Sequence, residues 1–363
     1  MDLLDVGVPK NLVSQAAIEF SGFNALTASV IWTRWSGMSD SEKELFSFQH
    51  FLQEYIASIE FDITYGCESY RTAFTRYGLR AELISGLVDE EFDDLMHTKS
   101  SKAWAQEIIY NRYLFLEYGR IASDSRQIQR NTGVAPARVS SFTVASGSGQ
   151  AFPGMDNEPA TLSSGERLLD GAWSTVKIML IFADKLDFVP IISDSPTDFN
   201  GRHSGWSFTP QLSAALHYAK YYKRLYPKEK IVVICLRIPN HLLEGDNQPY
   251  TLQYPSDMFK KVIWLSRRRG RRTSDMMDVN FMNAKLIIGH TSRGSETPFN
   301  QMQSWNEISD ANLVYIQDGG LKKPMTQYYF EDEFESILEE ALKQENLTIH
   351  DADNPEYEVD VSI

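Results

Sequence analysis

The chain has 363 residues, of which 42% are hydrophobic and 12% aromatic, and its formal net charge is −14. This length is enough for two domains, and the hydrophobic content excludes a wholly disordered chain. No run of about 18 apolar residues occurs and no signal peptide is recognisable, so the sequence predicts no membrane span and an intracellular protein, cytoplasmic or nuclear. Cys67 and Cys235 are too few for a disulfide framework and are expected to stay reduced.

The N-terminal part of the chain predicts an all-helical domain over residues 1–130. Ser39 and Asp40 are typical of a helix start, and the apolar residues after them recur at mostly helical spacing, which predicts a helix over 40–59. Further helices are expected at 67–76, 78–87, 88–96 and 102–129. Residues 131–166 are rich in Gly, Ser, Ala and Pro, so we expect a flexible linker there.

The second half predicts a mixed domain over 167–344 that opens with a helix at 166–181. Strands are expected at 188–193, 205–209, 231–238, 262–265, 285–289, 313–316 and 326–330. Helices are expected at 210–225, near 240–244, and at 256–260, 299–307 and 331–344. Strands and helices without regular alternation indicate an α+β fold rather than a doubly wound sheet. The acidic residues 345–363 predict a loose tail.

The charge is unevenly distributed along the chain. Residues 331–363 contain twelve acidic residues and one lysine, so the rest of the chain carries only −3. This balance disfavours nucleic acid as a partner. One basic run has seven cations within residues 260–272, and two interpretations are open. It is a solvated loop or an intramolecular partner of the acidic tail, or it is a nuclear-localisation or phosphate-binding patch whose core is 267–272.

The most informative stretch runs from Gly205 to Tyr222, where an aromatic strand is followed by a helix that begins at Thr209 and Pro210. With the segments 189–193 and 326–330, it resembles the NAD pocket of ADP-ribosyltransferase domains of the poly(ADP-ribose) polymerase type, nearest to uncharacterised fungal and microbial relatives. The resemblance covers about residues 165–342. It implies a split β-sheet with flanking helices, preceded in this chain by the helical domain.

The resemblance also implies site residues, with NAD as the substrate. The histidine, tyrosine and glutamate positions of the family fall on Ile191, Ser207 and Gln327, and all three differ from the polymerase pattern. A glutamine is neutral, so it cannot stabilise a ribosyl cation by charge, although it can hydrogen-bond a ribose hydroxyl. Glu331 is a candidate for the missing acid. The candidate NAD-binding residues are Gly205, Trp206, Tyr218, His203 and Arg202.

Each of these candidates has a plainer interpretation. Tyr218 is as well explained by core packing as by ring stacking, and His203 is better explained as a surface or hydrogen-bonded histidine. No histidine lies at metal-ligand spacing from another His or Cys, so no metal site is expected. Two functions remain open. The chain is an enzyme that transfers ADP-ribose or hydrolyses NAD at an atypical site, or it is a catalytically degenerate domain that binds a protein target or partner.

Overall fold

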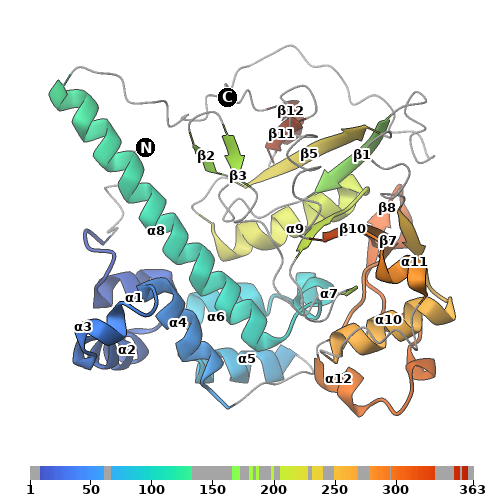
Figure 1. Cartoon of the computed structure of the whole chain (residues 1–363), viewed down its shortest axis with the longest axis horizontal. Coiled ribbons are helices and arrows are strands. Elements are labelled where there is room, and N and C mark those ends of the chain that lie inside the picture. The colour runs from blue at the N-terminus through green and yellow to red at the C-terminus, as the bar shows by residue number, and fades with distance from the viewer. Residues whose placement is uncertain are drawn as a thin grey trace. The chain divides into compact units, whose positions relative to one another are not determined.

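The chain is described here from a computed structural model. The described residues are 9–60, 67–132, 166–171, 180–182, 185–187, 198–199, 205–227, 231–239, 249–268, 278–294, 296–331, 347–351 and 354–358. The fold is mixed α+β, with helices in the first part and strands in the second (Figure 1). The chain divides into two compact units, residues 1–139 and 140–363, which are described separately below.

The first unit is helical within its described residues. Its elements are α1 (Gln15–Ser21), α2 (Ala25–Gly37), α3 (Asp40–Lys43), α4 (Phe48–Ala57), α5 (Cys67–Arg76), α6 (Ala81–Leu87), the 3₁₀ helix η2 (Glu90–Phe92), α7 (Asp93–Met96) and α8 (Ser101–Thr132). The long helix α8 packs against α1, α4 and α5. Trp104 on α8 is fully buried, and its indole N–H donates to the carbonyl of Met96 at 2.8 Å. The predicted helices over 67–76 and 102–129 are confirmed.

The single helix predicted over 40–59 is wrong, because two separate caps divide it. Ser39 forms a capping box with Glu42 that starts α3. Ser47 then starts α4, since its side chain accepts a hydrogen bond from the backbone N–H of His50. Phe46 stacks on Phe51 with ring centroids 6.2 Å apart, which is the hydrophobic staple of a new helix start.

Two further helices of this unit are shorter than predicted. Gly78, with φ of 78°, ends α5 in a left-handed turn, and the N–H of Leu79 donates back to the carbonyl of Phe74. The next helix, α6, therefore begins at Ala81 rather than at 78. The segment predicted as one helix over 88–96 is a 3₁₀ turn followed by α7, because Asp89 caps the turn through the N–H of Glu91.

Within its described residues, the second unit contains two four-stranded sheets. The first has the order β1-β5-β11-β12 and the second β4-β10-β7-β6; β2-β3 and β8-β9 are two-stranded. The strands are β1 (Glu166–Gly171), β2 (Leu180–Phe182), β3 (Lys185–Asp187), β4 (Gly205–Phe208), β5 (Val232–Pro239), β6 (Tyr250–Leu252), β7 (Leu286–His290), β8 (Tyr315–Asp318), β9 (Leu321–Pro324), β10 (Thr326–Glu331), β11 (Leu347–Asp351) and β12 (Asn354–Glu358). The helices are α9 (Leu212–Leu225), α10 (Asp257–Arg267), α11 (Val279–Met282) and α12 (Glu296–Gln301), with 3₁₀ helices η6 (Trp305–Glu307) and η7 (Asp310–Asn312).

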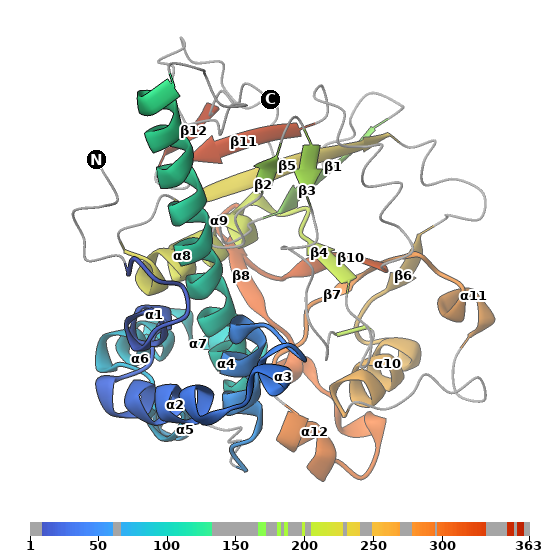
Figure 2. The same ribbon diagram turned by 60° about the vertical axis from the view of Figure 1, so that its left-hand side comes forward.

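Helices cover both sheets of this unit. α9 packs against β1 and β5 of the first sheet, as Figures 1 and 2 show. The second sheet is covered by α10, whose buried residues Phe259, Val262 and Ile263 join one core with Ile287 of β7 and Tyr329 of β10. The expected strands β4, β5, β7, β8 and β10 and the helix α9 are confirmed to within two residues.

The helix predicted over 166–181 is wrong. Residues 166–171 form β1, which pairs antiparallel with β5 over its whole length, and residues 180–182 form β2. The segment has good helix formers in Glu166, Arg167 and Leu168, but helix propensity is weak compared with pairing to a strand whose Val233 is fully buried.

The strand predicted at 262–265 is also wrong, because these residues lie inside α10. Ser256 caps this helix by accepting from the N–H of Phe259 at 3.2 Å. The apolar residues Phe259, Val262 and Ile263 then share one buried helix face with the small residue Ser266. A short apolar run cannot distinguish strand from helix unless the wider spacing is considered.

The loose tail predicted after residue 345 is a third correction. β11 pairs antiparallel with β5, and β12 pairs with β11, so residues 347–351 and 354–358 complete the first sheet (Figure 2). The predicted helix at 299–307 is divided into α12 and η6, since Ser304 and Glu307 form a new capping box. The linker predicted over 131–166 overlaps described elements at both ends, since α8 extends to Thr132 and β1 begins at Glu166, and residues 133–165 lie outside the described residues. The helix predicted over 331–344 begins at Glu331, which ends β10, and the rest of it lies outside the described residues, as do the predicted strand at 188–193 and the predicted helix near 240–244.

Candidate functional site

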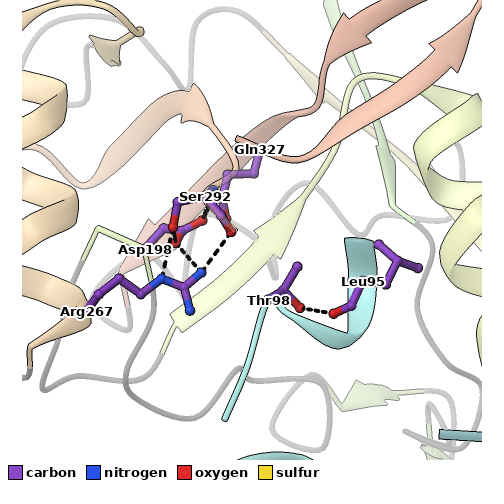
Figure 3. A network of polar contacts seen from close by, with 6 residues as sticks. All are labelled: Leu95, Thr98, Asp198, Arg267, Ser292 and Gln327. Carbon is purple, nitrogen blue, oxygen red and sulfur yellow. Dashed lines mark hydrogen bonds and ion pairs between the residues drawn. The ribbon is translucent and has the colours of Figure 1, made fainter. Parts of the chain in front are cut away.

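The most extensive buried polar cluster among the described residues surrounds Asp198, in the second unit (Figure 3). Asp198 forms an ion pair with Arg267 at 2.5 Å. Its carboxylate also accepts hydrogen bonds from the backbone N–H of Ser292 at 2.9 Å, from the Ser292 hydroxyl at 2.6 Å, and from the side-chain amide of Gln327. We call these four residues the Asp198 network.

The network joins parts of the chain that are far apart in sequence. Arg267 ends α10, Ser292 follows β7, and Gln327 lies on β10 directly opposite Gly289 of β7. Arg267 donates from Nε to the Ser292 hydroxyl at 2.9 Å and from Nη2 to the Ser292 carbonyl at 3.0 Å. The C-terminal end of α10, the segment after β7 and the strand β10 therefore all bind the carboxylate of Asp198.

Because the Asp198 network is buried, its contacts are needed to compensate the cost of removing its charges from water. Its four side chains are between 0% and 8% exposed. A carboxylate and a guanidinium are retained in a dry interior only when each compensates the other and the remaining sites are hydrogen-bonded. The four contacts to Asp198 match the acceptor capacity of a carboxylate. We infer that the ion pair is neutral as a whole and is held in one geometry.

The candidate catalytic residues occupy two adjacent strands. β4 and β10 pair antiparallel, with Ser207 opposite Tyr329 and Gly205 opposite Glu331. Because strand side chains alternate, Ser207, Gln327 and Glu331 lie on one face of this sheet. Tyr329 lies between the other two residues of β10 on that face and is fully buried. The structure thus brings these three candidates to one sheet face, with a core tyrosine among them.

Two of the candidate NAD-binding residues, Trp206 and Tyr218, do not contribute to that face. Trp206 is 2% exposed and alternation places it on the opposite face from Ser207, so its ring is enclosed by the core. Tyr218 on α9 is half-buried and packs against Ala214, Val314, Ile316 and Met325. This is the packing role that the sequence left open for Tyr218. Ile191, Arg202 and His203 lie outside the described residues.

Gly205 has a backbone role. A Cβ at this position would lie 2.5 Å from the carbonyl oxygen of Phe330 and 2.6 Å from the ring of Tyr329. β4 therefore approaches β10 in a way that only glycine permits. This explains the glycine at the start of the motif without reference to a ligand.

The arrangement constrains the chemistry available at the position of the family's acid. The Gln327 amide nitrogen donates to Asp198, so the side chain is already engaged as a hydrogen-bond donor. The nearest carboxylate, Asp198, is neutralised by Arg267. Neither group presents a free negative charge that could stabilise a ribosyl cation. Among the described residues no group of three His, Cys, Asp or Glu side chains could hold a metal ion, and none of the described helices has the length and hydropathy to span a membrane.

A half-buried histidine at the end of β7 predicts a pH dependence. Burial lowers the pKa of His290 below its usual value of 6.5, and its Nδ1 accepts the backbone N–H of Tyr254 at 3.3 Å. A histidine with a depressed folded-state pKa stabilises the fold above the unfolded pKa, and that contribution is lost as the pH falls toward the folded pKa. We expect the free energy of unfolding to fall between pH 7 and pH 5, at roughly the pKa of free histidine and below.

Urea unfolding at several pH values checks this expectation. His290→Asn keeps an acceptor near the Nδ1 position but does not titrate, so its decline should be shallower. His50→Asn, on the exposed face of α4, is the matched control and should behave as the unmodified protein. Equal pH dependence in all three proteins would contradict the assignment.

Sequence reasoning missed three of the four network residues. Arg267 was grouped with a basic run, and Asp198 and Ser292 belong to no motif. Asp198 lies 129 positions before Gln327 and 94 before Ser292, so no local pattern could connect them. Asp198, Ser292 and Arg267 are brought together only in the folded second unit, where β7 pairs with β10.

Comparison with known proteins adds no assignment. No protein-family model matches the chain, and neither the curated proteins nor the solved structures contain a match.

Proposed function

We propose that the second unit is an ADP-ribosyltransferase-like domain that acts as a non-catalytic interaction module. The observation that carries the proposal is the burial of Gln327 in the Asp198 network. The position that the resemblance assigns to the catalytic acid holds a neutral side chain whose amide donates to a neutralised carboxylate. A group of this kind stabilises the fold, but it cannot supply the charge that transfer of ADP-ribose requires.

The arrangement of strands and helices supports the ADP-ribosyltransferase-like part of the proposal. The two four-stranded sheets fit the expected split β-sheet, and α9 directly follows β4 as the resemblance implies. The two motif strands β4 and β10 are neighbours although their sequences are more than 100 positions apart.

The resemblance also indicates what a catalytically active site at this position would need. A glutamate in place of Gln327 would put a second carboxylate beside Asp198, where like charges disfavour ionisation of both. The substitution Gln327→Glu is therefore expected to destabilise the second unit without creating transferase activity. An active enzyme would instead need an acid from elsewhere, for which Glu331 is the remaining candidate on the same sheet face.

Titration of the full chain with NAD, with nicotinamide release measured by chromatography, tests the proposal. We expect no detectable binding at millimolar NAD and no release. Nicotinamide release that disappears in Gln327→Ala, while that variant stays folded by circular dichroism, would overturn the proposal.

A stacking role for Tyr218 is tested in the same experiment. If Tyr218 stacked on the nicotinamide, Tyr218→Ala would weaken NAD binding by about 1 kcal/mol, near fivefold. We expect no such effect, because the ring packs against α9 and the β8-β9 region. Tyr218→Phe, which retains the packing surface, is the control for stability.

A further inference from the structure

The outer face of α10 carries an array of cations on aromatic rings. The inner face of this helix is buried through Phe259, Val262 and Ile263. At 100° per residue, the positions opposite that face are Asp257 in the first turn, which is exposed, and then Lys261, Trp264 and Arg268, with Lys260 beside them. The last four side chains are half-buried. They lie within about 12 Å along the helix axis at 1.5 Å per residue.

Each of the three cations is held over an aromatic ring. The Arg268 guanidinium lies 4.2 Å from the ring centroid of Trp264, and Lys261 Nζ lies 5.0 Å from that of Trp305 on η6. Lys260 Nζ lies 5.6 Å from the ring of Tyr254. Cation–π contacts fix the direction of these side chains without neutralising their charge. A guanidinium stacked on a ring keeps its N–H edge available to a planar anion.

These cations have no acidic partner in the described part of the chain. No ion pair involves Lys260, Lys261 or Arg268, in contrast to Arg267, which is paired with Asp198. The net charge of the protein is −14, so three neighbouring cations without an acidic partner make this part of the described surface locally positive. The sequence continues with Arg269, Arg271 and Arg272, so the positive charge extends beyond the helix.

We propose that this face of α10 is a docking surface for an acidic polypeptide segment of a partner protein. The inference names the kind of partner for the proposed interaction module and rests on that proposal. The charge of the surface is complementary to carboxylates, and a stacked arginine binds a carboxylate in a bidentate manner. Four residues of an extended peptide span about 13 Å, which matches the length of the array.

Two other occupants fit the structure less well. The chain's acidic residues at 351, 356 and 358 lie on β11 and β12 of the first sheet, whereas α10 packs on the second sheet. Single-stranded nucleic acid binds by stacking bases on open aromatic faces. Here Trp264, Trp305 and Tyr254 each already carry a cation over the ring.

Fluorescence anisotropy with a fluorescein-labelled octaglutamate peptide tests the surface in the full chain, at one fixed low ionic strength. The triple variant Lys260→Gln, Lys261→Gln, Arg268→Gln should bind about tenfold more weakly, since each exposed ion-pair contact contributes a factor of about two to three. The matched control is Lys220→Gln, Lys223→Gln, Arg224→Gln on α9, which changes the net charge equally and should bind as the unmodified protein. Arg268→Lys should weaken binding to an intermediate degree, because an ammonium lacks the planar fork.

Three outcomes would overturn the proposal. These are equal weakening by both triple variants, no binding of octaglutamate by the unmodified protein, and tighter binding of a labelled oligothymidine that depends on the same three cations. Both triple variants remove only half-buried or exposed charges, and circular dichroism checks that they fold. NAD turnover is measured separately, so a failure of peptide binding leaves the assignment of Gln327 unaffected.

Discussion

Replacing Arg267 by methionine should destabilise the second unit by about 3–5 kcal/mol, the range expected when one partner of a buried ion pair is removed. Methionine fills much of the volume of the arginine stem, so the loss comes mainly from the uncompensated charge of Asp198. Ser292 would also lose two hydrogen bonds from the guanidinium. Hydrogen exchange measured by mass spectrometry should show faster exchange at residues 286–292 and 326–331.

The neighbouring residue supplies a close control. Arg268→Met removes a half-buried cation of the same helix turn, and its effect should stay below about 1 kcal/mol. The double variant Asp198→Asn, Arg267→Met removes both charges, so its destabilisation should be smaller than the sum of the two single effects. Additive effects would show that the two side chains do not interact in solution.

A second large effect is expected from Gly205→Ala, which should destabilise the second unit by about 3 kcal/mol through overpacking. The added Cβ would meet the backbone carbonyl of Phe330 at 2.5 Å, and a backbone atom cannot rotate away as a side chain can. Relief requires β4 to separate from β10, which weakens the pairing of Gly205 with Glu331. Chemical denaturation followed by tryptophan fluorescence measures the change, since Trp206 is adjacent to the substitution.

Gly37→Ala provides the comparison for this substitution. Gly37 ends α2, and a Cβ there would meet no atom within 4 Å. Replacement of a helical glycine by alanine in open space is expected to be neutral or stabilising by up to about 1 kcal/mol. Equal effects at the two positions would mean that the close approach of β4 and β10 does not exist in solution.

Local signals were sufficient to predict much of the secondary structure. The helices α5, α8 and α9 and the strands β4, β7 and β10 follow from apolar spacing and capping residues. Two of the failures share one cause, because pairing with a distant strand decided the conformation. Residues 166–171 form β1 and residues 347–351 form β11, because both segments flank the strand β5. In α10 the helical spacing of Phe259, Val262, Ile263 and Ser266 was present in the sequence but was outweighed by a short apolar run.

The candidate site could be predicted only in part. The motif order identified the neighbouring strands that carry Ser207, Gln327 and Glu331, and the structure places these residues on one sheet face. The charge and hydrogen bonding around Gln327 could not be predicted from the motif, because they depend on Asp198 and Arg267, which the motif does not contain. Burial of a polar side chain is a property of the assembled core. For that reason the sequence alone cannot decide whether Gln327 contacts a ligand or is only a strand residue.

The position of β5 between β1 and β11 has a consequence for how the protein is made. The middle strand of the first sheet lies at residues 232–239, but one of its two neighbours is synthesised more than 100 residues later. Until residues 347–351 have left the ribosome, one edge of β5 has no partner from this sheet, and an unpaired apolar strand edge promotes association with other chains. The sheet of the second unit can therefore close only late in synthesis, and nascent chains halted before residue 347 would depend on chaperones to remain unassociated.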